Sequence, residues 1–202
     1  KARLAYVLPN FQNPTGRTMN EERRQALVEK AQELGIPLIE DNPYGDLWYG
    51  EQPPKPLAAR NPEGVIYLGS FSKVLAPGLR IGFIVAPKSV YNKLLQAKQA
   101  ADLHTPGFNQ RVVSEVIKDG FLDRHVPTIR KMYGAQRDAM LIALEREMAG
   151  LDVTWTRPVG GMFLWLRLPA GMDAFDDLEI EQALTALTQL QATLQANSAN
   201  GT

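Results

Sequence analysis

The 202-residue sequence has no cysteine, only two histidines and no net charge, because 22 Lys plus Arg balance 22 Asp plus Glu. Without cysteine the chain forms neither a disulfide framework nor a thiolate metal site, and two histidines are too few for a histidine-rich one. The charge balance argues against nucleic-acid binding through a whole-chain positive field. No apolar run approaches the roughly 18 residues that span a bilayer. We therefore expect a soluble, cytoplasmic protein with no metal ion, no nucleic-acid partner and no membrane segment.

Short apolar runs and one amphipathic segment make up the first 90 residues. Residues 4–8, 36–40, 65–68 and 81–86 lack polar alternation, which is typical of strands that are buried on both faces. Residues 18–21 have the spacing of a capping box, and apolar residues then recur at helical intervals up to Gly35. Such strands with helices between them predict an α/β fold with a parallel-rich, doubly covered sheet.

Helical periodicity dominates the middle of the chain, over residues 89–103, 110–118 and 126–148. Two strand-like stretches, 153–156 and 162–168, flank a turn-rich break and predict a hairpin or a small α+β layer. The leucines of residues 178–194 predict a last helix, followed by a frayed tail. A second, smaller domain is predicted to begin near residue 133.

Each of the first three predicted strands runs into a cluster of polar or reactive residues, at 13–16, 41–44 and 69–73. In open α/β sheets the ligand lies outside the carboxyl ends of the strands, so we expect these clusters to converge on one crevice. Lys73 is the candidate nucleophile there, because a desolvated amine near another cation loses its proton readily and attacks carbonyl groups.

The other polar residues of the clusters suit a phosphorylated pyridine ring. The Arg80 guanidinium and the hydroxyls of Ser70 and Ser72 are donors of the kind that bind phosphate. Asp41 can keep a ring nitrogen protonated, as a pyridine cofactor that acts as an electron sink requires. Tyr44 and Asn13 can hydrogen-bond a phenolic oxygen on the ring, so together these residues describe a pyridoxal phosphate site.

Each of these residues also has a simpler interpretation when it is taken alone. A lysine or an arginine in a loop is most often a solvated surface residue. Residues 13–16 contain good turn formers, and Tyr44 can be a core aromatic with its hydroxyl at the surface. Only the combination at this spacing favours a cofactor site.

Three segments together resemble a known signature. Residues 10–16, 41–44 and 70–82 match, in order and spacing, the class I/II aminotransferases of the fold-type I pyridoxal-phosphate enzymes. Residues 160–165, Gly-Gly-Met-Phe-Leu-Trp, are similar to a segment of the subgroup that contains 2-aminoadipate and kynurenine aminotransferases. The resemblance implies a cofactor-binding large domain whose second half is residues 1–132, and part of a small C-terminal domain with a frayed tail over residues 133–202.

The resemblance also implies a set of site residues: Asn13, Asp41, Tyr44, Ser70, Ser72, Lys73 and Arg80. Lys73 is implied to form the aldimine with pyridoxal 5'-phosphate and to shuttle the proton at the substrate's α-carbon. The implied reaction moves an amino group from an L-amino acid to a 2-oxo acid in two ping-pong halves. The family's enzymes are homodimers, so a homodimer is expected here too.

The sequence departs from the family at both ends. In the family about as much sequence again precedes the first strand, so we expect the chain to be a fragment that lacks the N-terminal half. After Gly171 there is no arginine to bind the substrate's carboxylate, which leaves the amino donor and acceptor open. Three alternatives also stay open: the cofactor-binding domain of a transcriptional regulator, a non-catalytic remnant of the fold, and another fold-type I reaction such as a lyase or decarboxylase.

Overall fold

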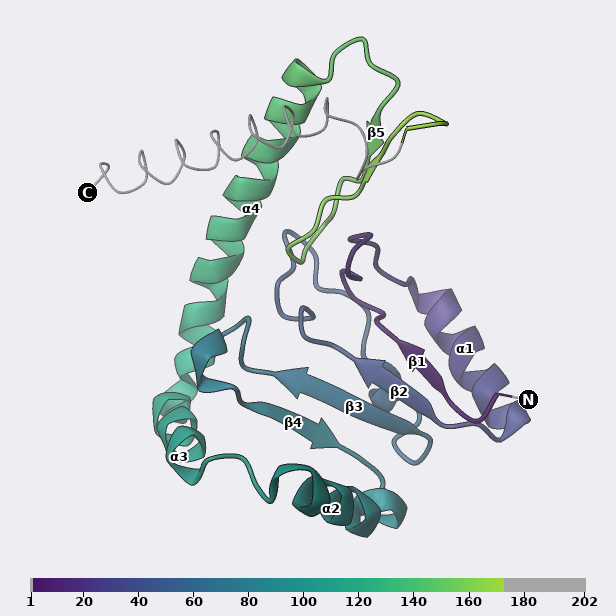
Figure 1. Cartoon of the computed structure of the whole chain (residues 1–202), viewed down its shortest axis with the longest axis vertical. Helices are drawn as coiled ribbons and strands as arrows, with labels where there is room; N and C mark the ends of the chain where they lie inside the picture. The colour runs from purple at the N-terminus through teal and green to yellow at the C-terminus, as the bar shows by residue number, and fades with distance from the viewer. Residues whose placement is uncertain (1, 173–202) are drawn as a thin grey trace.

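A four-stranded sheet forms the centre of the computed structural model, which describes residues 2–172 (Figure 1). The strands are ordered β1 (Ala5–Val7), β2 (Leu38–Asp41), β3 (Val65–Ser70) and β4 (Gly82–Val85). The first three run parallel, and β4 is antiparallel to β3. This arrangement confirms the prediction of an α/β fold with a parallel-rich sheet.

Helix α1 (Glu21–Leu34) connects β1 to β2, as the sequence predicts. It begins one residue after Asn20, whose side-chain oxygen accepts the N–H of the third helical residue at 3.0 Å. The expected capping role of Thr18 is therefore wrong, and its hydroxyl accepts the N–H of Phe11 instead. The helix ends at Gly35, whose φ of 62° lies in the left-handed region that glycine tolerates best.

Two apolar clusters hold this half of the chain together. The first lies between α1, the sheet and the 3₁₀ turn η1 (Leu57–Ala59), and consists of Val28, Ala31, Leu38, Leu57 and Val65. The second lies at the carboxyl end of the sheet, and consists of Phe11, Tyr44, Leu47, Val74 and Val126. The second cluster joins the loops that follow the strands to the long helix α4 (Phe121–Glu147).

Strand β4 does not have the burial that its apolar sequence predicts. Phe83, Ile84 and Val85 are 43%, 54% and 59% exposed, so the expectation of a strand buried on both faces is wrong here. The physical reason is position: β4 lies at the edge of the sheet, and α2 (Lys88–Asp102) after it has no buried residue.

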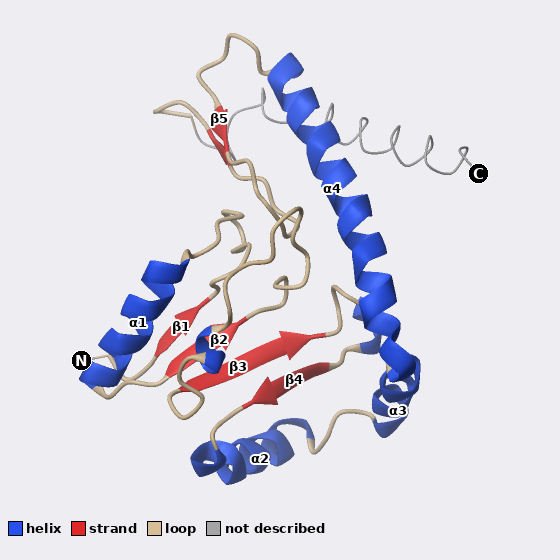
Figure 2. Ribbon diagram, turned by 180° about the vertical axis from the view of Figure 1, so that it is seen from behind, coloured by secondary structure: helices blue, strands red, loops and turns tan. Residues whose placement is uncertain are grey.

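The helices in the middle of the chain begin and end at other residues than the sequence predicts. Helix α3 (Gly107–Val116) starts and ends earlier than predicted, and α4 starts at residue 121 instead of 126. Short 3₁₀ turns, η2 (Pro77–Leu79) and η3 (Lys118–Gly120), precede β4 and α4. Helix α4 is 27 residues long, about 40 Å. It starts beside the carboxyl end of β3 and continues without a break through residue 133, so a domain boundary there stays a prediction (Figures 1 and 2).

The predicted hairpin beyond α4 is present as an antiparallel pair of two-residue strands, β5 (Thr154–Trp155) and β6 (Leu166–Arg167). The loop between them returns to the segment that follows β2, because Gly160 bridges to Trp48 and the N–H of Gly161 donates to the carbonyl of Leu47 at 2.7 Å. The helix predicted over residues 178–194 and the tail lie outside the described residues.

Candidate cofactor-binding site

The loops after the three parallel strands meet at the carboxyl edge of the sheet (Figure 2). Phe11 from the first loop, Tyr44 from the second and Val74 from the third share one buried cluster. Parallel strands place their carboxyl ends on the same edge, and apolar contacts between the loops then hold the polar residues around them in one region. The structure thus brings the sequence-predicted residues onto one side of the sheet.

Lys73 lies in the turn that follows β3 and is half-buried. Its Nζ atom is 6.0 Å from the centroid of the Tyr44 ring, close enough for an attraction between the ammonium and the ring face. Lys73 also lines an open hollow of about 420 Å³, together with Ser72, Ile129, Tyr133 and Met162. The amine is therefore accessible from a space that the turn and α4 enclose between them.

Asp41 ends β2 and accepts a hydrogen bond from the hydroxyl of Tyr6 on β1. This bond, aided by partial burial and by the negative charge of Asp41, raises the pKa of Tyr6 to about 12. The sequence analysis treated Tyr6 only as a strand residue. The available signal was a single tyrosine within an apolar strand next to the strand that ends in Asp41. Tyr6 thus holds one of the two carboxylate oxygens of Asp41.

Tyr44 is 7% exposed and meets the edge of the Phe163 ring at 5.3 Å between centroids, with the rings at 87°. Burial raises the pKa of the Tyr44 hydroxyl, and the charge of Asp41 acts in the same direction. The neighbouring side chain of Asn13 lowers the pKa in part. Tyr44 and Asn13 are thus neighbours, and the Tyr44 phenol stays protonated at neutral pH as a donor.

Ser70, Ser72 and Arg80 lie around one turn. The N–H of Ser72 donates to Oγ of Ser70 at 3.1 Å. Ser70 pairs with Gly82 across the β3–β4 ladder, and the N–H of Phe71 donates to the carbonyl of Ile81, so the chain at Arg80 lies beside this turn. Arg80 has a left-handed backbone, with φ at 55°, and an exposed side chain.

These donors have the chemistry that an anionic ligand needs. Within residues 2–172, no carboxylate forms an ion pair with Arg80. A guanidinium, two hydroxyls and backbone N–H groups are donors of the kind that suit the oxygens of a phosphate. The residues of the turn therefore fit a phosphorylated ligand whose reactive group reaches Lys73.

The described part of the chain has neither a metal-binding cluster nor a membrane-spanning helix. Residues 2–172 contain no group of three His, Asp or Glu side chains that could hold a metal ion. Among the helices of these residues, none is long and apolar enough to cross a membrane.

Comparison with known proteins gives the class to which this fold and site belong. The family model "Aminotransferase class I and II" matches residues 5–196. The chain belongs to this family of aminotransferases.

Several of the similar proteins are aminotransferases of about twice this length. "Aromatic-amino-acid aminotransferase 1" of Thermococcus litoralis is 49% identical over 185 residues, which are 91% of this chain and 44% of that protein. "2-aminoadipate transaminase" of Thermus thermophilus is 46% identical over 178 residues, 86% of this chain and 44% of that protein. The crystal structure of Pyrococcus horikoshii kynurenine aminotransferase, described as a complex with PMP, superposes with a TM-score of 0.84 at 48% identity, covering 89% of this chain and 44% of that one.

The chain spans less than half the length of these relatives. A different kind of relative is an HTH-type transcriptional regulator of Bacillus subtilis, YisV, which is 40% identical over 164 residues, 81% of this chain and 34% of that protein.

Proposed function

We propose that the chain carries the cofactor-binding and catalytic lysine region of an aminotransferase that moves an amino group from an L-amino acid to a 2-oxo acid. The observation that supports this most directly is the convergence of the Phe11, Tyr44 and Val74 loops, which gathers an amine, a carboxylate, a phenol and phosphate donors at one sheet edge. The residues proposed to act are Asn13, Asp41, Tyr44, Ser70, Ser72, Lys73 and Arg80.

Lys73 has the central role in this proposal. Its Nζ atom attaches the cofactor and, once released, carries a proton to and from the substrate's α-carbon. When it is bound, pyridoxal phosphate supplies an electron sink for negative charge at that carbon. The carboxylate of Asp41 keeps the proton on the ring nitrogen, and the Tyr6 hydroxyl orients that carboxylate by holding its other oxygen.

The remaining residues orient the cofactor ring and limit its rotation. The Tyr44 hydroxyl, which burial keeps protonated, donates to the phenolic oxygen, and the Asn13 amide supports it. Ser70, Ser72 and Arg80 bind the phosphate and thereby set the distance from the ring to Lys73. Anchoring at both ends of the ring limits its rotation, which is the positional requirement for proton transfer at one face.

We further propose that the protein works as a cytoplasmic homodimer. Phe83, Ile84 and Val85 leave exposed apolar side chains on the edge strand β4, of the kind that further protein contacts cover. Light scattering on the purified protein tests this, and a monodisperse monomer at 100 µM, roughly the concentration at which weak dimers form, contradicts it.

The proposed role of Lys73 is tested by adding pyridoxal phosphate, recording the visible spectrum, reducing with borohydride and mapping the modified lysine by mass spectrometry. Lys73→Ala and Lys73→Arg should both abolish the reducible adduct, because arginine keeps the charge but cannot attach the cofactor. Lys131→Ala, an exposed lysine on α4, is the matched control and should label like the original chain.

Two results would contradict the proposal. A Lys73→Ala chain that gives the adduct at the same stoichiometry excludes Lys73. An original chain that gives no band, or label scattered over surface lysines, shows that these residues are not sufficient to capture the cofactor.

A second candidate function is supported by the similarity to YisV: the cofactor-binding domain of a transcriptional regulator. The two candidates differ in what the gene encodes before residue 1. A winged-helix segment there favours the regulator, and its absence excludes it. Amino-group transfer by the purified protein, measured with a panel of L-amino acids and 2-oxo acids, favours the enzyme and also excludes a non-catalytic remnant.

A further inference from the structure

A chain of four hydrogen-bonded side chains runs from α1 to the crevice. Nη2 of Arg24 donates to Oδ1 of Asn10 at 2.5 Å, and Nδ2 of Asn10 donates to Oδ1 of Asn42 at 2.8 Å. Nδ2 of Asn42 then donates to the hydroxyl oxygen of Tyr67 on β3 at 2.9 Å. We call these four residues the Arg24 chain.

The direction of the Arg24 chain is set at its first member. A guanidinium has only donors, so Asn10 must turn its oxygen toward Arg24 and its NH₂ group toward Asn42. Asn42 must in turn present its oxygen to Asn10 and its NH₂ group to Tyr67. Because each amide has one acceptor end and one donor end, Arg24 determines the orientation of both.

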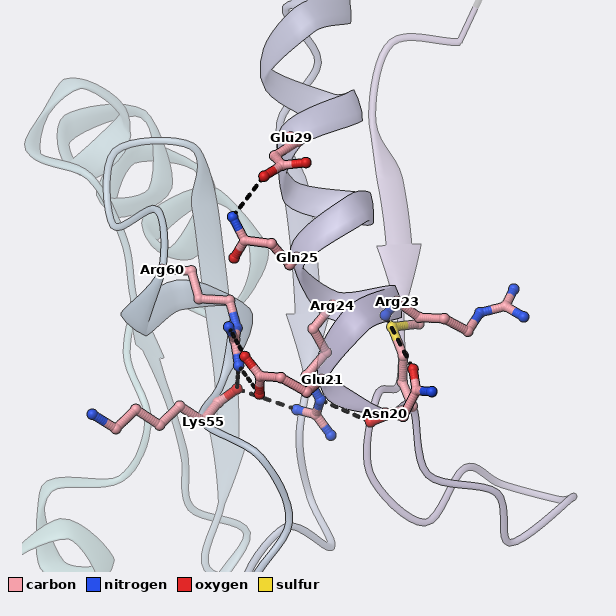
Figure 3. Close-up of polar contacts among 9 residues, drawn as sticks. Asn20, Glu21, Arg23, Arg24, Gln25, Glu29, Lys55 and Arg60 are labelled. Carbon is pink, nitrogen blue, oxygen red and sulfur yellow. Dashed lines mark hydrogen bonds and ion pairs between the residues drawn. The ribbon is translucent and has the colours of Figure 1, made fainter.

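Arg24 itself is fixed and enclosed. Although it lies in the first turn of a surface helix, it is 0% exposed, whereas its neighbour Arg23 points away into solvent (Figure 3). Its other donors reach backbone carbonyls: Nε that of Met19 at 2.9 Å, Nη2 that of Pro9 at 3.3 Å and Nη1 that of Lys55 at 3.4 Å. A guanidinium held by this many acceptors has one position.

The segment that carries Lys55 is fixed from a second side. Arg60 forms a two-pronged ion pair with Glu21, at 2.6 and 2.7 Å, and also donates to the Lys55 carbonyl (Figure 3).

Burial lowers the pKa of Arg24, while the negative charge of the fully buried Glu40 raises it in part. A buried cation costs several kcal/mol unless it is paired and bonded, and Arg24 meets that condition through its four hydrogen bonds.

The far end of the Arg24 chain lies next to the proposed site residues. Asn42 follows Asp41 directly and begins the turn that contains Tyr44. Its N–H continues the ladder to the carbonyl of Leu68 at 3.0 Å. Its amide folds under its own turn, since a Cβ atom at Gly45 would lie 2.3 Å from Nδ2 of Asn42. The amide of Asn42 therefore lies directly against the turn at Gly45.

We propose that Arg24 is a positioning residue for the crevice: through Asn10 and Asn42 it sets the placement of Asp41 and Tyr44 from a distance. The inference rests on the proposed cofactor-binding function. If it holds, a change that breaks the Arg24 chain while leaving Arg24 satisfied loosens the turn of residues 41–47 and weakens cofactor binding, without unfolding α1.

Asn10→Asp makes that break. Its carboxylate still accepts from Arg24, and more strongly because both groups are charged, but it has no NH₂ group to donate to Asn42. The Asn10–Asn42 bond is therefore lost unless Asn42 turns its amide over, which takes Nδ2 away from Tyr67 and from its place beside Gly45. Tyr67→Phe is the second variant, since it removes only the last acceptor of the chain. Asn92→Asp, on the exposed side of α2, is the control for the added negative charge.

Two measurements on each variant carry the test. Hydrogen exchange followed by mass spectrometry, on the cofactor-free chain, compares peptides over residues 41–47 with peptides over α1. Spectroscopic titration with pyridoxal phosphate gives its dissociation constant. For Asn10→Asp we expect faster exchange confined to 41–47, an unchanged urea midpoint and a dissociation constant raised roughly 10- to 100-fold. Tyr67→Phe should change both in the same direction by less, and Asn92→Asp should change neither.

The proposal is overturned if both variants exchange at 41–47 like the original chain. It is also overturned if exchange rises equally in α1, because the four residues then serve stability alone. An original chain that takes up no pyridoxal phosphate contradicts the proposed function instead, and the exchange comparison still decides the role of Arg24.

Discussion

Gly160→Ala should destabilise the chain by about 3 kcal/mol, the upper part of the range for overpacking a core. An added Cβ atom would lie 2.3 Å from Cζ of Phe11 and 2.6 Å from the carbonyl oxygen of Leu47. Phe11 is 1% exposed and Leu47 is 0% exposed, so neither the ring nor the backbone can move into solvent to make room. Both belong to the cluster under the crevice, and the strain should also reduce cofactor affinity.

Gly69→Ala is the matched control. A Cβ atom there would come even closer to a ring, 2.2 Å from Cζ of Phe83, but Phe83 is 43% exposed on the edge strand and can turn outward. The expected cost is below about 1 kcal/mol. Urea denaturation followed by tryptophan fluorescence gives both free energies of unfolding from the midpoint and slope. Equal losses in the two variants, or none for Gly160→Ala, would show that the exposure of the neighbour does not decide the cost.

Two further predictions concern α1 and the Tyr6–Asp41 bond. Asn20→Ala should lower the free energy of unfolding by about 1 kcal/mol, because it removes the cap of α1, and thermal denaturation measures it; an unchanged melting temperature refutes the cap. The pKa of Tyr6 is raised to about 12, so its contribution to stability is complete below pH 10, the usual value in the unfolded chain, and is lost as pH rises to about 12. The stability difference between the original chain and Tyr6→Phe should shrink over that interval in urea denaturation, with Tyr91→Phe as the control; a constant difference argues against the bond.

The sheet and the grouping of the site residues were predictable because both follow from local signals. Apolar runs that end in Gly, Pro or Asn mark the strands, and parallel strands must present their carboxyl ends on one edge. The clusters that begin at residues 13, 41 and 69 therefore had to lie near one another once the strands were parallel. What this reasoning leaves open is which side chains touch, since that depends on loops of irregular shape.

The errors have the same origin. Thr18 and Asn20 are both residue types that cap helices well. The path of the chain from Phe11 decides between them: the Thr18 hydroxyl accepts the N–H of Phe11, and Asn20 caps α1. The apolar sequence of β4 predicted burial, but a strand's burial depends on what packs on it, and β4 is an edge strand with Phe83 half in solvent. The composition of a segment indicates which secondary structure it favours, but not which other segments pack against it.

Arg24 was missed for a reason that can be corrected. In the run Glu-Glu-Arg-Arg both arginines look like surface residues, but Arg24 lies four residues before Val28 and seven before Ala31, on the helix face that packs on the sheet. When a charged residue recurs at helical spacing with the apolar residues of a helix, it lies on the buried face and needs several hydrogen-bond partners there. Applied before the structure, this rule separates Arg24 from Arg23.

The partners of Arg24 explain why lysine could not take its place. Its acceptors are the Asn10 amide oxygen and the carbonyls of Pro9, Met19 and Lys55, which lie around a flat group and are reached by three different nitrogens. An ammonium offers its three donors from one atom and cannot reach acceptors spread over the length of a guanidinium. A guanidinium is not deprotonated in proteins, so the orientation that Arg24 imposes on Asn10 is independent of pH.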